Sequence, residues 1–219
     1  MDPLTITTSV VTLIGAISAS YDTVGKIKDL PKAFDEVKKS LPIVQKVLED
    51  TRKRLQTVQT ALDDHNKQLV IQTVQQCEEK ATILRDIFDK LERKCKEDRD
   101  ADTTWSKAKA WYREALRGMK AHRVETLMKD IMGRIKALAM NELLSLHDDV
   151  DVVSSALAEL SHAGSSLEDW EFEMGGNHAT QVNESGAHGQ QNNTQGGSHV
   201  MNSGYNVSGS NHTFHFGKG

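Results

Sequence analysis

The segment 104–123 holds the residue types that bind negatively charged surfaces. It combines six lysines and arginines with two tryptophans and a tyrosine, against one acidic residue. The candidate residues for such a contact are Trp105, Lys107, Lys109, Trp111, Arg113 and Arg117. Cations interleaved with amphipathic rings suit an anionic membrane surface or a partner helix. The alternative is that the rings pack inward while the cations are only solvated.

Catalytic chemistry has no comparable signature in this sequence. There is no Gly-x-x-x-x-Gly-Lys loop, no nucleophile elbow, and no cluster of metal-ligating side chains in the part with helical patterning. The histidines near the C-terminal end lie in a polar tract, where isolated histidines are usually solvated. We therefore expect no enzyme activity, no catalytic residue, no metal and no cofactor.

The segment 175–219 has a composition unlike the rest of the chain. It contains ten of the 15 glycines and seven of the nine asparagines, no proline, and two charged side chains, Glu184 and Lys218. Such a segment has too few large apolar groups to offset the entropy of ordering a packed core. It can stack on copies of itself, because Asn and Gln form hydrogen-bonded ladders along a cross-β axis. We refer to 175–219 as the tail.

A loose repeat within the tail favours self-assembly. Four polar, strand-compatible runs each end at a glycine, which supplies the positive φ of a tight turn. The candidate stacking residues are Asn177, Gln181, Val182, Asn183, Gln191, Asn192, Asn193, Val200, Asn202, Asn206 and Val207. The alternative is a solvated, disordered tail of the same composition.

The stretch from Pro3 to Tyr21 carries no charged residue. Its candidate membrane-inserting residues are Leu4, Ile6, Val10, Val11, Leu13, Ile14 and Ile17. Its length approaches that of a bilayer span, but many threonines and serines make it too polar for a firm transmembrane assignment. One interpretation is a central helix surrounded by a bundle. The other is a helix that docks on the soluble domain and can be released into a membrane.

The sequence from residue 24 to residue 160 predicts helices throughout. Apolar residues recur at three- and four-residue spacing from Val24 to Leu41, after which Pro42 is placed to open a new helix. A seven-residue repeat runs from Val70 to Cys95, and further stripes cover 105–119 and 124–160, the last with a register shift. The expected fold is an all-α, up-and-down helical bundle over 1–163. An acidic, solvated linker over 164–174 and the disordered, amyloid-competent tail are expected to follow it.

Composition and cysteine spacing limit the cellular location and the binding partners that we expect. The net charge of −4 argues against a general nucleic-acid binder. Cys77 and Cys95 lie 18 residues apart in one helical pattern, about 27 Å along a helix, so we expect reduced thiols and an intracellular protein. The expected location is the cytoplasm.

Four short motifs carry a resemblance to a known family. They are the opening Met1 to Ile6, the Leu-Pro turns within Lys28–Phe34 and Leu41–Val44, and the run Val124–Ile131. They resemble the SesA or HeLo-like domain found at the N-terminus of fungal NACHT and other P-loop NTPases. The tail resembles the sigma motif, an amyloid-forming, prion-like repeat of the same fungal system.

The resemblance implies an effector of programmed cell death in heterokaryon incompatibility or innate immunity. The implied partner is an NLR-type NTPase receptor with a matching motif, whose stacked motifs would template the tail into a self-assembling amyloid. The clustered bundle would then act on membrane lipids through its N-terminal helix. The alternative is a non-enzymatic adaptor that recruits a partner in NLR signalling without touching lipid.

Overall fold

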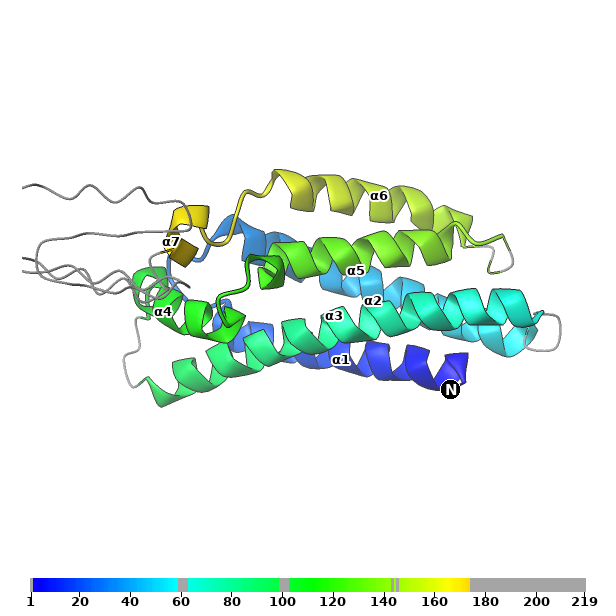
Figure 1. The fold of residues 1–219 in the computed structure, drawn as a ribbon, viewed down its shortest axis with the longest axis horizontal. Helices are drawn as coiled ribbons and strands as arrows, with labels where there is room; N and C mark the ends of the chain where they lie inside the picture. Colours follow the sequence, from blue (N-terminus) through cyan, green and yellow to red (C-terminus); the bar gives the residue numbers. More distant parts are fainter. Residues whose placement is uncertain (1, 59–62, 99–102, 143, 145, 174–219) are drawn as a thin grey trace, which may run out of the picture. The chain divides into compact units, whose positions relative to one another are not determined.

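The structure is a computed structural model that describes residues 2–58, 63–98, 103–142, 144 and 146–173. The long helices are α1 (Pro3–Val24), α2 (Lys32–Val58), α3 (Asp64–Glu97), α5 (Val124–Ala139) and α6 (His147–His162). Shorter elements are α4 (Trp105–Leu116), the 3-10 turn η1 (Lys120–His122) and α7 (Asp169–Glu173). No strand occurs among these residues. The predicted all-α, up-and-down bundle is confirmed (Figure 1).

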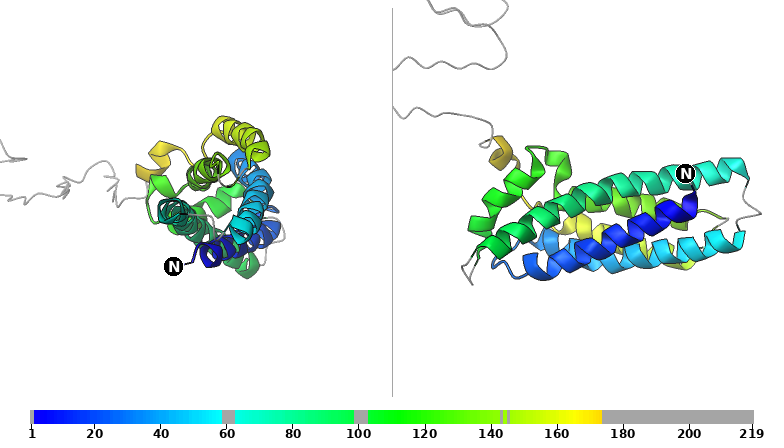
Figure 2. Two further views of the ribbon diagram at one scale, coloured as in Figure 1. Left: turned by 90° about the vertical axis from the view of Figure 1, so that its right-hand side faces the viewer. Right: turned by 90° about the horizontal axis from the view of Figure 1, so that it is seen from below.

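The long helices alternate in direction and form a four-helix bundle with a fifth helix on its outside. Helix α1 packs on α2 and α3, and these two pack on α5, so α1 and α5 occupy opposite corners (Figure 2). Helix α6 covers the outer side of α5 and α2. Of the two interpretations of this segment, a central helix surrounded by the bundle is contradicted, because α1 packs mainly on α2 and α3 and has a third side exposed to solvent.

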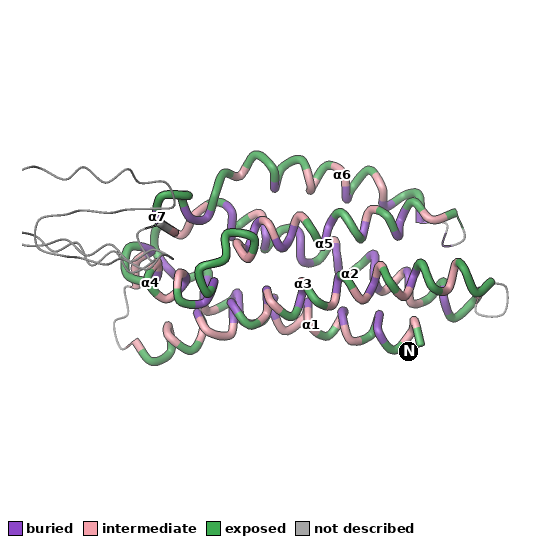
Figure 3. The backbone as a smooth tube through the Cα atoms, in the orientation of Figure 1, coloured by how far each residue is buried: buried purple, intermediate pink, exposed green. Residues whose placement is uncertain are grey.

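Figure 3 shows the buried positions following one stripe along each long helix. The seven-residue repeat of α3 is buried from Val70 to Leu91, as its spacing predicts, because a narrow apolar stripe is what two flanking helices can cover. At the α4 end of the bundle, Phe34 packs edge-on against Phe88, Trp105 and Tyr112 at centroid distances of 5.3 to 6.0 Å. Such aromatic pairs add to the stabilisation from burial.

Two helix boundaries differ from the sequence prediction. The apolar spacing from Val24 to Leu41 is interrupted, since α1 ends at Val24 and α2 begins at Lys32. Pro42 does not open a helix but lies inside α2. It is exposed, so water can reach the turn where the proline supplies no N–H donor.

The two connections near the α4 end are joined to each other. Lys28, between α1 and α2, forms an isolated parallel bridge with Thr104, just before α4. Its N–H donates to the carbonyl of Thr103 at 3.0 Å, and its own carbonyl accepts from the N–H of Trp105 at 2.7 Å. These bonds fix the end of α1 to the start of α4.

Candidate functional site

Helix α1 begins at a well-formed N-cap. The Asp2 carboxylate accepts a hydrogen bond from the N–H of Thr5 at 3.2 Å, and Pro3 occupies the first turn, where its missing N–H costs nothing. The predicted membrane-inserting residues divide into two groups. The first, Ile6, Val10, Ile14 and Ile17, is fully buried in the bundle core. The second, Leu4, Val11 and Leu13, is half-buried at the edges of that stripe.

From Pro3 to Tyr21, the solvent side of α1 is polar but uncharged. Thr5, Thr8, Thr12 and Ala19 are exposed there. The hydroxyl of Thr8 donates to the carbonyl of Leu4 at 2.9 Å, and that of Thr12 donates to the carbonyl of Thr8 at 3.0 Å. These hydroxyls therefore find partners within the helix itself. By length and composition α1 also qualifies as a membrane-spanning helix, the only one to do so among the residues searched.

Hydroxyl groups also attach α1 to α3. The Ser9 hydroxyl donates to Glu78 at 2.5 Å, and the Ser20 hydroxyl donates to Glu92 at 2.9 Å and to Asp89 at 3.2 Å. The ion pair with Lys96 and the bond from Ser20 lower the pKa of Glu92 despite partial desolvation. The seam between α1 and α3 is thus held by neutral donors on α1 and carboxylates on α3.

The predicted basic and aromatic surface is only partly a surface. Trp105 is 8% exposed and packs against Phe34 and Tyr112, so its inclusion as a surface residue is wrong. Its ring is drawn inward because the apolar stripe of α4 faces the core. Trp111 is half-buried, whereas Arg117 is exposed in the left-handed conformation that ends α4.

The cations of this surface are bound to acidic residues from outside α4. Lys107 pairs with Asp98 at 2.7 Å. Lys109 Nζ lies 2.7 Å from Glu171, and Arg113 Nη2 lies 3.4 Å from the same carboxylate. Lys120 and Arg123 both pair with Asp169. Five of the six cations of 104–123 are therefore paired with acids outside this segment, at positions 98, 169 and 171.

The segment predicted as a solvated acidic linker is docked on the bundle, which corrects that prediction. Leu167 is 1% exposed, and Phe172 packs on the core with the Arg123 guanidinium 4.8 Å from its ring centre. Glu171 is 4% exposed. Desolvation raises its pKa, but the bonds from Lys109 and the N–H of Glu168 outweigh this, and the pKa is lowered overall.

A buried polar cluster anchors the segment just before α7. The Tyr112 hydroxyl lies 2.7 Å from that of Ser166 and accepts a bond from the N–H of Val124 at 3.0 Å. The N–H of Ser166 donates to the buried Glu125 at 3.1 Å. Burial is the main cause that raises the pKa of Tyr112. The sequence signal for this docking was present, since acids at 169 and 171 alternate with two aromatic residues, but it does not say which cations they meet.

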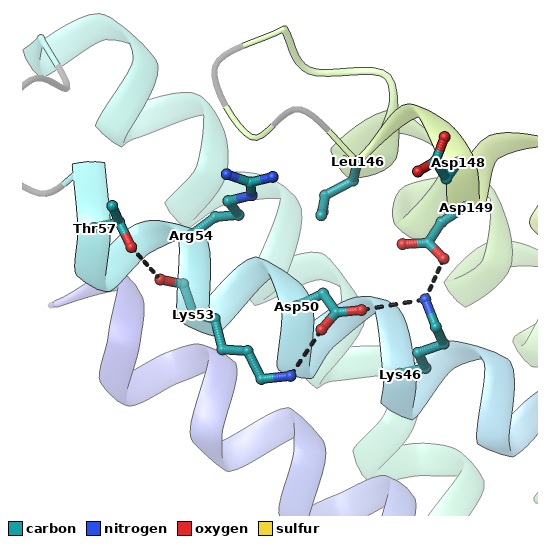
Figure 4. A pocket seen from close by; sticks show the side chains of 8 residues that line it. All are labelled: Lys46, Asp50, Lys53, Arg54, Thr57, Leu146, Asp148 and Asp149. Carbon is teal, nitrogen blue, oxygen red and sulfur yellow. Dashed lines mark hydrogen bonds and ion pairs between the residues drawn. The ribbon is translucent and has the colours of Figure 1, made fainter.

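A polar cavity of about 400 Å³ lies between α2 and the start of α6 (Figure 4). Its lining residues are Lys46, Asp50, Lys53, Arg54, Thr57, Leu146, Asp148 and Asp149. Lys46 bridges Asp149 at 2.5 Å and Asp50 at 3.2 Å. Three cations and three carboxylates line the cavity, and the ion pair between Lys46 and Asp149 joins α2 to α6.

Reactive groups elsewhere are few. Cys77 and Cys95 both lie in α3 and are free thiols. Burial raises the pKa of the Cys77 thiol to about 12, so it is a core side chain and a poor nucleophile. No group of His, Cys, Asp and Glu that could hold a metal ion occurs in the described part of the chain. The predicted stacking residues of the tail lie outside the described residues.

The architecture defines the class of the chain as an all-α, up-and-down helical bundle. The family model SesA, described as the N-terminal domain on NACHT_NTPase and P-loop NTPases, matches residues 7–138. This match covers more than half of the chain, and the chain belongs to the SesA family. The family context indicates signalling linked to NLR-type NACHT NTPases. No curated protein and no solved structure matches the chain.

Proposed function

We propose that this chain is an effector of NLR-linked programmed cell death that acts on membranes through α1. The observation that carries the proposal is the state of α1 in the bundle. It occupies a corner and carries no charge from Pro3 to Tyr21, and the outward hydroxyls of Thr8 and Thr12 bond to its own backbone.

A helix with these properties can move from the bundle into a bilayer at a low cost in free energy. In a bilayer every polar group needs an internal partner, because no water is available to satisfy it. The bonds from Thr8 to Leu4 and from Thr12 to Thr8 stay within the helix and would persist after release. The apolar stripe of Ile6, Val10 and Ile14 that now packs on α2 and α3 would then face lipid.

The tail supplies the trigger in this proposal. A cross-β stack is costly to nucleate for a free segment but much cheaper on a preformed edge. An NLR-type NTPase receptor with a matching sigma-like motif would provide that edge. Stacking raises the local concentration of bundles, which favours insertion of helices that are individually marginal, and the protein would move from the cytoplasm to the plasma membrane.

An adaptor without membrane activity is the second candidate. It is favoured by the complete burial of Ile6, Val10, Ile14 and Ile17, which gives α1 a structural role in the resting bundle. In that case the tail would bring the bundle to another protein, and α1 would never leave α2 and α3.

Dye release from vesicles distinguishes the two functions. The purified full chain is mixed with dye-loaded vesicles, alone or with sheared fibrils of a peptide covering 175–219. An effector releases dye only after seeding, whereas an adaptor assembles without release. Fibrils of an unrelated sequence control for contact between amyloid and lipid. Seeded assembly that leaves the vesicles intact would refute the membrane proposal.

A further inference from the structure

Four cations from separate segments meet beneath α7. They are Lys109 and Arg113 of α4, Lys120 of η1, and Arg123 just before α5. We call these four residues the basic site. The two carboxylates of Asp169 and Glu171 bind to it. Helix α7 thus occupies the basic site as an intramolecular anionic ligand.

The fit of α7 in the basic site is incomplete. The Nε atoms of Arg113 and Arg123 are both buried, yet neither has a hydrogen-bond partner among the described residues. A lipid phosphodiester presents two charged oxygens, as a carboxylate does, and it matches the bidentate donor geometry of guanidinium groups. The donors of the basic site therefore exceed what α7 uses.

Helix α7 is also short and partly exposed. It has five residues, too few for a helix that is stable by itself. Trp170 is 56% exposed, and the Asp169 side chain is 70% exposed, so its ion pairs are open to screening by salt. Ser166 and Leu167, by contrast, are anchored in the core. Release of residues 168–173 would leave the bundle itself intact.

We propose that the basic site is a latent binding site for the phosphate groups of anionic lipids, which α7 covers in the resting protein. Removing α7 would present four cations on one face of the bundle end. Each lysine or arginine close to an anionic membrane surface contributes about 1 kcal/mol, equivalent to about fivefold in partitioning. Uncovering Lys109 and Arg113 should therefore raise vesicle binding by at least about tenfold.

Tail stacking would be one way to uncover the site, and this step rests on the proposed function. From Phe172 to Gly175 the chain spans at most about 10 Å. Cross-β layers repeat every ~4.8 Å, whereas two packed helices are roughly 20 Å across. Bundles are thus much wider than the spacing between layers, and tethers this short cannot place every bundle beside the stack. Releasing α7 back to Leu167 would lengthen the tether to roughly 27 Å.

Vesicle co-sedimentation with an opened variant tests the site without tail assembly. The opened variant is the full chain with Asp169→Asn and Glu171→Gln, kept monomeric and unseeded. The matched control is Asp151→Asn with Glu159→Gln, two exposed acids on α6 whose loss changes the net charge equally. Vesicles are phosphatidylcholine with or without phosphatidylserine, and circular dichroism confirms folding.

We expect the opened variant to bind phosphatidylserine vesicles at least about tenfold more strongly than the wild type, and the control variant to match the wild type. Adding Lys109→Gln and Arg113→Gln to the opened variant should abolish the gain. The single change Asp169→Asn, at an exposed side chain that cannot disturb the core, should give a smaller gain.

Three results would overturn the proposal. They are no gain in the opened variant, an equal gain in the control, and a gain that survives loss of Lys109 and Arg113. Inorganic phosphate is tested separately by its effect on the melting temperature. If phosphate stabilises the opened variant while vesicles do not bind, the site takes small anions and the lipid assignment is wrong. This experiment measures vesicle binding, whereas the test of the proposed function measures dye release. The failure of either test therefore leaves the result of the other unaffected.

Discussion

Replacing Thr12 by Asp separates the folding of α1 from its insertion into a membrane. Thr12 lies close to the middle of α1 and is exposed in the resting bundle. A charge at an exposed helix position changes the free energy of unfolding by about 0.5 kcal/mol or less. At the centre of a membrane-spanning helix, the same aspartate costs roughly 2.5 to 3.5 kcal/mol. The substitution should therefore reduce insertion by about two orders of magnitude and leave folding nearly unchanged.

Thr82→Asp is the matched control for this experiment. Thr82 is exposed on α3, and its hydroxyl donates to the carbonyl of Glu78 at 2.8 Å, as that of Thr12 does to Thr8. An aspartate at 82 also meets like charges one turn away at Glu78 and Asp86, so the control slightly overestimates the folding cost. Ile14→Asp is unsuitable, because Ile14 is fully buried and a charge there would unfold the bundle.

The assay is seeded dye release from vesicles, with thermal unfolding followed by circular dichroism. We expect Thr12→Asp to melt within a few degrees of the wild type, to assemble normally when seeded, and to release little dye. Thr82→Asp should release dye as the wild type does. A folded, assembled Thr12→Asp protein with wild-type release would refute the role of α1 in membranes.

Further predictions concern the core, the docked segment and the tail. Phe34→Ala should lower the free energy of unfolding by about 3 to 5 kcal/mol, because the ring is fully buried among three other aromatic rings. Urea unfolding measures this loss, and a loss below about 1 kcal/mol would contradict the packing. The pKa of Glu171 lies below its ordinary value of 4.5, so its stabilisation of α7 is complete above that pH and is lost as the pH falls through the lowered pKa. Protease cleavage after residue 167 should therefore increase on acidification in the wild type but change less in Glu171→Gln. A peptide covering 175–219 should form fibrils with cross-β diffraction, and charged replacements at Val182 and Val200 should slow their growth; a peptide that stays monomeric when seeded would exclude assembly.

The sequence predicts the bundle well where local periodicity decides the structure. The repeat from Val70 to Cys95 places α3 and its buried face correctly, because a sustained seven-residue spacing permits few alternatives. The prediction that Pro42 opens a helix is wrong for a physical reason. A proline signals a helix start only statistically, and here packing on both sides of Pro42 carries α2 through it.

The charged surface could not be derived from spacing, since it depends on contacts across the fold. Lys109 and Glu171 are 62 residues apart, and nothing in either local segment identifies the other as its partner. The cations around Trp105 in the sequence predict a surface position, yet the apolar stripe of α4 turns its ring inward. The absence of charge from Pro3 to Tyr21 can be read from the sequence, but the place of α1 at a corner of the bundle cannot.

The bridge between Lys28 and Thr104 determines how α1 could leave its place. It fixes the chain just beyond Val24, so the C-terminal end of α1 would remain attached beside α4 while the rest swung outward. The helix would then pivot about a hinge at residues 25–27. A helix of 22 residues is about 33 Å long, close to the thickness of the hydrocarbon core of a bilayer. This hinge lies at the end of the bundle that also carries the basic site (Figure 1). Binding of the basic site to lipid and insertion of α1 would therefore start from the same end of the bundle.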